Sequence, residues 1–80
     1  MRKGESLGQR LQRLRQAAGI TQEQLAAQTG LAVSNIRNWE QDHRTLNVFA
    51  LFAIAHALER RMEEFIEGVV PSHDAVGGRD

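Results

Sequence analysis

A pair of short amphipathic segments that flank Gly30 constrains the fold of this 80-residue chain more than any other feature. The first segment starts with a capping-box pattern, because Thr21 can cap a helix and Gln24 can bond back to it. Ile20, just before the cap, can pack against Leu25 as a hydrophobic staple. Glycine enters the left-handed conformation at the lowest cost and therefore ends many helices. The pattern predicts two short helices folded across a tight turn.

The second of these helices is predicted to begin near residue 32 or 33 and to have two chemically different sides. At about 100° per residue, one side gathers Ile36, Trp39 and Glu40. The opposite side gathers Val33, Ser34, Arg37, Asn38 and Gln41. Arginine can donate to guanine, asparagine can pair with adenine, serine can bond to either, and valine fits the thymine methyl group. Any solvated surface helix also has a polar outer side, so this side alone does not indicate base recognition. The indication comes from its combination with the capped helix and the turn before it.

The segment from Gln22 to Glu40 resembles the helix-turn-helix of the phage-repressor (Cro/cI-type, Xre-like) family, and the resemblance extends over about residues 7 to 66. The matching residues are Thr21-Gln22-Glu23-Gln24-Leu25-Ala26, Gly30-Leu31, Ser34, Ile36 and Glu40. The resemblance implies an all-α, five-helix, lambda-repressor-like DNA-binding domain with a central helix-turn-helix.

The resemblance also implies roles for individual residues. The positions that read bases in the family are occupied here by Val33, Ser34, Arg37 and Asn38. The positions that meet DNA phosphates are occupied by Gln22, Asn35, His43 and Arg44. In the family, an arginine late in the first helix pairs with a glutamate at the end of the second helix of the motif, and these positions are Arg15 and Glu40 here. Two residues depart from the family pattern: Ala32 replaces a capping Ser or Thr, and Val33 replaces a longer polar residue.

Three more helices are predicted around this motif. The first runs from Leu7 to Ala18, with Ser6 and Gln9 as a second capping box. The fourth begins after Asn47 and runs to Leu58, with a core stripe of Val48, Leu51, Phe52, Ala55 and Leu58. The fifth is marked by Met62, Phe65 and Ile66. The family has a Gly and a Ser where Glu59 and Arg61 stand, so one continuous helix also fits; we favour a break, because a compact core needs Met62 and Phe65 folded back.

The fourth predicted helix is apolar on more than one side. Phe49 and Ala53 lie outside its predicted core stripe. A contiguous apolar patch usually marks an interface. We therefore predict a homodimer contact around Phe49 and Ala53, assisted by Arg60 and Glu64 of the fifth helix.

Charge and size set limits on the domain organisation. Residues 1–45 carry seven Lys and Arg against four Asp and Glu, and residues 46–80 carry three against six, so the halves have formal charges of +3 and −3. A chain polarised in this way can turn a basic side to phosphate, although two solvated faces would look the same. We expect one DNA-binding domain over residues 1–67 and a disordered tail over residues 68–80.

Several function classes are not indicated by the composition. With no cysteine, disulfides and thiolate metal sites are excluded, which suits a reducing compartment. The longest apolar run, Val48 to Ala55, is far shorter than the about 17 residues of a membrane span, and no signal peptide is evident. The three histidines lack ligand spacing, and no nucleophile-and-base or phosphate-loop pattern occurs. We expect a cytoplasmic protein with no metal, no cofactor and no catalytic residue, hence not an enzyme.

Taken together, these features predict a sequence-specific regulator that binds double-stranded DNA, as a dimeric repressor on a pseudo-palindromic operator. One alternative is an antitoxin that represses its own operon and binds a toxin through the tail. The other is a protein-interaction module that has lost DNA binding, which the zero net charge and Val33 would suit. Salt-dependent binding to duplex DNA separates this last class from the other two.

Overall fold

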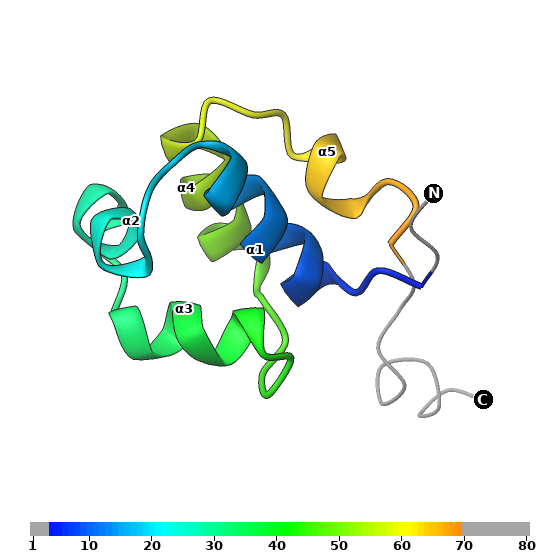
Figure 1. Cartoon of the computed structure of the whole chain (residues 1–80), viewed down its shortest axis with the longest axis horizontal. Coiled ribbons are helices and arrows are strands. Elements are labelled where there is room, and N and C mark those ends of the chain that lie inside the picture. The colour runs from blue at the N-terminus through cyan, green and yellow to red at the C-terminus, as the bar shows by residue number, and fades with distance from the viewer. Residues whose placement is uncertain (1–3, 70–80) are drawn as a thin grey trace.

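The computed structural model of the chain describes residues 4–69. In this range it has five helices and no strands: α1 (Leu7–Ala17), α2 (Gln22–Thr29), α3 (Val33–Glu40), α4 (Val48–Ala57) and α5 (Glu63–Ile66). Helix α1 occupies the middle of the molecule, with α3 along its lower edge and α5 beyond its opposite side (Figure 1). The all-α, five-helix fold class predicted from the sequence is confirmed. Residues 70–80, most of the predicted tail, lie outside the described range.

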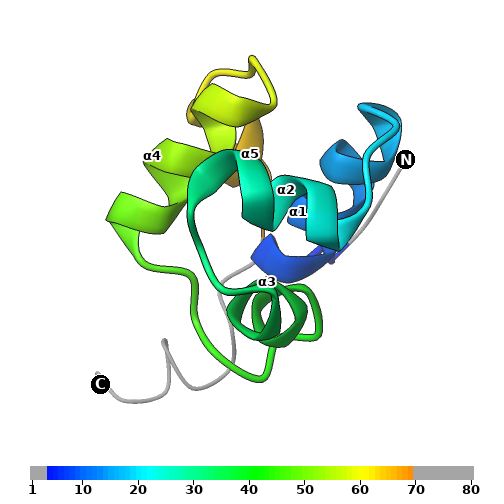
Figure 2. The ribbon, with the colours of Figure 1, turned by 90° about the vertical axis from the view of Figure 1, so that its left-hand side faces the viewer.

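All five helices contribute to one hydrophobic core. Its fully buried large side chains come one from each helix, and they are Leu11, Leu25, Ile36, Ile54 and Phe65. Trp39 of α3 is also buried, on the side of the helix where the sequence placed it with Ile36. Helices α1 and α2 both pack on α3 (Figure 2), so two neighbours hold its inner side while its opposite side faces outward.

The predicted helix ends are present where the sequence has capping residues. The Ser6 and Thr21 hydroxyl oxygens each accept a hydrogen bond from the backbone N–H three residues later. In return, the backbone N–H groups of Ser6 and Thr21 donate to the side-chain oxygens of Gln9 and Gln24. Gly30 ends α2 in the left-handed conformation, with φ of 77°. Helix α3 begins after Ala32, which makes no side-chain capping bond. The turn of the motif is therefore defined by the α2 side and the glycine.

Helices α4 and α5 are separate, which confirms the predicted break. Glu59 adopts a left-handed conformation with φ of 56°, although the position has no glycine. A left-handed residue other than glycine costs about 1–2 kcal/mol. Phe65 has no solvent-accessible surface, because the chain reverses after Leu58 and packs this ring into the core. Burial of this ring offsets the strain at the turn.

The predicted core stripe of α4 is wrong at two of its five positions. Leu51, Ala55 and Leu58 are buried as predicted, but Val48 is 61% exposed and Phe52 is 63% exposed. Ala50 and Ile54 are buried in their place. The reason is that α4 is apolar on nearly every side, so its sequence does not define one face, and its packing against α2 decides which side is buried. Within residues 4–69, no helix is long and apolar enough to span a membrane.

Candidate nucleic-acid interface

The side of α3 that faces away from the core carries the residues predicted to read bases. Ser34 and Arg37 are exposed, and Val33 and Asn38 are partly buried. Asn35, predicted to meet phosphate, is exposed on the same helix. The alternation arises because Ile36, Trp39 and Glu40 turn inward and leave the intervening residues outward. Helix α3 therefore presents short polar side chains and one arginine on a rigid, well-packed element.

A buried ion pair joins α3 to α1. Arg15 Nε lies 2.6 Å from Glu40 Oε2, and Arg15 Nη2 lies 3.1 Å from Glu40 Oε1, so the contact is bidentate. The remaining guanidinium nitrogen, Nη1, donates to the Ile20 carbonyl oxygen at 2.8 Å. The Glu40 side chain is almost completely buried. Such a pair fixes orientation, because leaving either charge alone in this position would be costly.

Gln22, predicted to touch a phosphate, is tied to the same ion pair. Its side-chain Nε2 donates to Glu40 Oε1 at 2.9 Å. Gln22 is the first residue of α2, where backbone N–H groups favour an anion. The hydrogen bond therefore holds the start of α2 beside α3, so the two helices of the motif have a defined separation.

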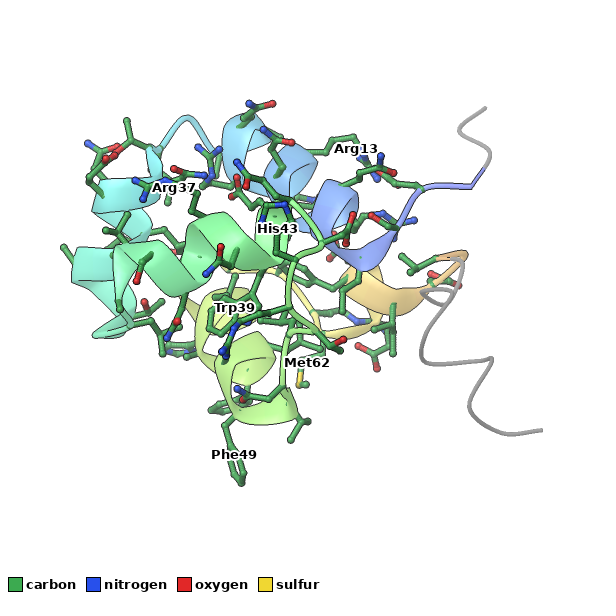
Figure 3. The ribbon with its side chains drawn as sticks, turned by 90° about the horizontal axis from the view of Figure 1, so that it is seen from below. Arg13, Arg37, Trp39, His43, Phe49 and Met62 are labelled. Atoms are coloured by element: carbon green, nitrogen blue, oxygen red, sulfur yellow. The ribbon has the colours of Figure 1, made fainter. Side chains whose placement is uncertain are left out.

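The loop after α3 places the other two predicted phosphate residues in solvent. His43 and Arg44 are both exposed. The loop is ordered by backbone hydrogen bonds from Asp42 N–H to the Trp39 oxygen at 3.1 Å and from His43 N–H to the Asn38 oxygen at 2.9 Å. In Figure 3, Phe49 projects at the bottom of the view, away from Arg37 at the upper left and His43 near the middle.

A second charged cluster at the start of α1 was missed by the sequence analysis. Glu5 Oε1 lies 2.7 Å from Arg10 Nε, and Glu5 Oε2 lies 2.8 Å from Arg13 Nε. The hydrogen bond from Arg13, together with the bond and charge of Arg10, lowers the pKa of the Glu5 carboxyl to about 2. Burial of the carboxyl acts in the opposite direction but is outweighed. Glu5 precedes α1 by two residues, so no helical spacing indicated these pairs.

The ion pairs leave two arginines distinct from the rest. Within residues 4–69, the arginines engaged in ion pairs are Arg10, Arg13, Arg15, Arg60 and Arg61. No ion pair in that range involves Arg37 or Arg44, and both are exposed. Among the described residues, the two arginines without an ion pair are therefore the one on the outer side of α3 and the one in the loop that follows it. Between residues 4 and 45, the arginines outside ion pairs are therefore fewer than the formal charge count suggested.

The predicted dimer residues lie on α4 and near α5. Phe49 is 83% exposed and projects from the end of α4 (Figure 3), whereas Ala53 is partly buried. Arg60 Nη1 pairs with Glu64 Oε1 at 2.8 Å. The exposed Val48 and Phe52 add to Phe49, so the apolar patch is larger than predicted. The signal that could have shown this was the absence of a polar side on α4.

The comparisons with known proteins agree with this geometry. The sequence profile of the helix-turn-helix family matches residues 11–65, more than half of the chain. The restriction-modification controller protein C.AhdI from Aeromonas hydrophila has a similar structure, with 35% identity, a TM-score of 0.72, and coverage of 75% of this chain and 91% of that one. No curated protein sequence matches the chain significantly.

The P22 c2 repressor is similar in two solved structures. Its crystal structure in complex with a synthetic operator has 25% identity and a TM-score of 0.72, and covers 80% of this chain and 97% of that one. The solution structure of its DNA-binding domain has 24% identity and a TM-score of 0.76, with coverage of 84% and 88%, and supports the fold. By its family profile and its likeness to these proteins, the chain belongs to the phage-repressor-like (Cro/cI-type) helix-turn-helix family of DNA-binding transcriptional regulators.

Proposed function

We propose that the protein is a sequence-specific transcriptional regulator that reads double-stranded DNA with α3 in the major groove. The observation that carries the proposal is the outer side of α3, where Ser34, Arg37 and Asn38 stand on a helix locked to α1 by a buried bidentate ion pair. An α-helix fits the major groove, where each base pair has a distinct pattern of donors and acceptors. An element held rigidly can aim these side chains at base edges without a large ordering cost.

Phosphate contacts would set the position of α3 along the duplex. The candidates are Gln22 and Asn35, on the two helices of the motif, and His43 and Arg44 in the loop after α3. Of these, Arg44 carries a permanent charge and is unpaired within the described residues, so it is expected to contribute most to salt-dependent affinity. Base contacts from α3 would then supply sequence preference.

The protein is proposed to act as a homodimeric repressor in the cytoplasm. The support is the exposed apolar patch of Val48, Phe49 and Phe52, together with the similarity to a repressor solved with an operator and to a controller protein. Two copies related by a two-fold axis would read half-sites about one helical turn apart, which predicts a pseudo-palindromic operator. No catalytic residue and no cofactor form part of the proposal. The antitoxin alternative assigns toxin binding to the tail, of which residues 70–80 lie outside the described range.

Selection of bound duplexes from random DNA, followed by titration at several salt concentrations, tests this function. The logarithm of affinity for the selected duplex is expected to fall linearly with the logarithm of salt concentration, and a shuffled duplex of equal composition should bind more weakly. Failure to bind any duplex would instead favour the protein-interaction module.

Two arginine variants give a matched control for the phosphate assignment. Arg44→Ala should weaken binding to the selected and the shuffled duplex alike and reduce the salt slope by about 1 for each protomer. Arg61→Ala removes the same charge from an exposed residue next to α5 and should leave both quantities unchanged. Equal effects of the two variants would mean that only net charge, and no specific contact at Arg44, matters.

A further inference from the structure

We propose that Asp42 is a positioning residue whose carboxylate latches the loop carrying His43 and Arg44 onto the first turn of α1. The inference rests on the proposed function, because it assigns that loop to DNA phosphates. It adds a residue that would not itself touch DNA but would determine how the loop is presented.

Both carboxylate oxygens of Asp42 accept hydrogen bonds from the start of α1. The Ser6 hydroxyl donates to Oδ2 at 2.6 Å, and the Gly8 backbone N–H donates to Oδ1 at 3.2 Å. Ser6 is the N-cap of α1 and Gly8 is its second residue, so this N–H has no partner within the helix. A carboxylate at a helix N-terminus is also favoured by the helix dipole. The contact spans 34 and 36 residues of sequence, so it joins two distant segments.

The backbone at Asp42 is held in a conformation that needs support. Its φ is 61°, in the left-handed region where aspartate is tolerated better than most residues but still at a cost. This residue turns the chain out of α3, and His43 and Arg44 follow directly. The two bonds to α1 stabilise the turn, so they also fix the direction in which those two side chains leave it.

Gly8 provides an independent observation that the contact is close. A Cβ built at Gly8 would overlap the Trp39 carbonyl oxygen and lie 2.5 Å from Asp42 Oδ1. Gly8 is buried, although it stands in the first turn of a helix, where glycine has no advantage of its own. The absence of a side chain at position 8 is what lets α1 approach the end of α3 and receive the Asp42 carboxylate.

The latch has two consequences for the loop. An ordered loop loses less conformational freedom when His43 and Arg44 meet phosphate, so affinity is higher than for a mobile loop. The carboxylate is also engaged by α1, and a negative charge beside the phosphate-binding residues is thereby partly offset by the N–H groups and the helix dipole. Asp42 is therefore expected to act on affinity for all duplexes, and base preference should not change.

Two neutral replacements of Asp42 separate the latch from its charge. Asp42→Asn keeps an acceptor for the Gly8 N–H, can still bond to Ser6, and tolerates the left-handed region. Asp42→Gly suits that region equally well but has no side chain. Because both variants lose the same charge, a difference in their DNA affinity reports the hydrogen bonds between residue 42 and the start of α1. The Gly variant is expected to bind selected and shuffled duplexes roughly tenfold more weakly than the Asn variant, with a smaller salt slope. Equal affinities and slopes would overturn the proposal.

Ser6→Gly removes the hydroxyl that donates to Asp42 and leaves the loop sequence unchanged. A loss of affinity in this variant therefore cannot come from added glycine flexibility within the loop. Glycine is an acceptable N-cap, so α1 should remain folded. We expect weaker binding to every duplex, in the same direction as Asp42→Gly. If Ser6→Gly binds like the wild type while Asp42→Gly is weak, backbone flexibility explains the latter and the latch is wrong.

Hydrogen exchange of the His43 amide in the DNA-free protein tests the latch without the proposed function. This N–H donates to the Asn38 oxygen at 2.9 Å and should exchange faster in Asp42→Gly and Ser6→Gly than in Asp42→Asn. Equal exchange in all three would overturn the latch. A wild-type protein that binds no duplex would overturn the proposed function, and the exchange comparison would still decide whether the latch exists.

Discussion

The outer sides of α3 and α4 differ in chemistry, although both belong to helices of similar length that pack on the same core. The outer side of α3 exposes Ser34, Asn35 and Arg37, whose polar groups can form hydrogen bonds with water or with base edges. The outer side of α4 exposes Val48, Phe49 and Phe52, which gain stability only against another apolar surface. The difference shows that one small domain presents two chemically different exposed surfaces, one polar and one apolar, which suit the proposed DNA and dimer contacts respectively.

The two helices are also held in different ways. The position of α3 depends on directional polar contacts at Glu40, which pairs with Arg15 and accepts a hydrogen bond from Gln22. The buried side chains of Ile36 and Trp39 add apolar packing. The inner side of α4 has no charged residue and is held by apolar packing alone. Loss of a single polar group should therefore disturb α3 strongly, whereas α4 should respond only to changes in volume.

The largest effect is expected for the buried ion pair. Arg15→Ala should destabilise the protein by about 3 kcal/mol in chemical denaturation, because Glu40 is left buried without its partner. Replacing both residues by apolar ones should cost much less. The matched control is the surface pair of Arg60 and Glu64, where Arg60→Ala should leave the free energy of unfolding almost unchanged. A double-mutant cycle with no coupling between Arg15 and Glu40 would contradict the account of how α3 is held.

The next effect concerns the apolar side of α4. Phe49→Glu should give a folded monomer in sedimentation, because the exposed ring lies outside the core and is proposed to form the dimer contact. Its affinity for a duplex with two half-sites should fall by about 100-fold or more, since the avidity of paired binding is lost. His56→Glu adds the same residue at another exposed position of α4 and should leave the dimer intact. If Phe49→Glu still sediments as a dimer, the interface lies elsewhere, with helix α5 the next candidate.

A smaller effect is expected on the polar side of α3. Arg37→Ala should cost roughly 1–3 kcal/mol on the selected duplex and relax preference at one base pair, because a bidentate contact to guanine is lost. Arg37→Lys keeps the charge but loses the paired donors and should show the same relaxed preference. An equal loss of affinity for every sequence would identify Arg37 as a phosphate contact.

The smallest effect concerns pH. The pKa of Glu5 is lowered from its ordinary value of 4.5 to about 2 in the folded protein, because Arg13 and Arg10 stabilise its charged form. Its contribution is therefore fully present above about pH 5 and is lost as the pH falls toward about 2. Denaturation across that interval should show a shallower loss of stability for Glu5→Gln than for the wild type. Parallel curves for the two proteins would mean that the ion pairs of Glu5 do not stabilise the fold.

Local capping signals explain why the fold could be predicted from the sequence. Ser6 and Thr21 have their partners three residues away, and the Gly30 turn depends on the conformational freedom of one residue. These signals act within one turn of chain, so the sequence states them directly. The outer side of α3 could also be predicted from the sequence, because its apolar and polar residues fall on clearly different sides of the helix.

The features that could not be predicted depend on contacts between distant segments. The buried side of α4 is chosen by its neighbours, because its own composition is apolar almost all round. Asp42 contacts the start of α1, more than 30 residues away in the sequence. The contact depends on the absence of a side chain at Gly8, which becomes evident only in the folded structure. Glu5 precedes α1, whereas its partners Arg10 and Arg13 lie within that helix, so no helical spacing marks these pairs.

Methylation interference at guanine N7 tests most directly whether the outer side of α3 reads DNA. N7 lies in the major groove and is one of the two acceptors that an arginine pairs with. The account predicts that N7 methylation of one guanine in each half-site blocks binding by the wild type, whereas Arg37→Ala is no longer sensitive to it. Wild-type binding that no guanine methylation affects, or identical interference patterns for the two proteins, would contradict the account.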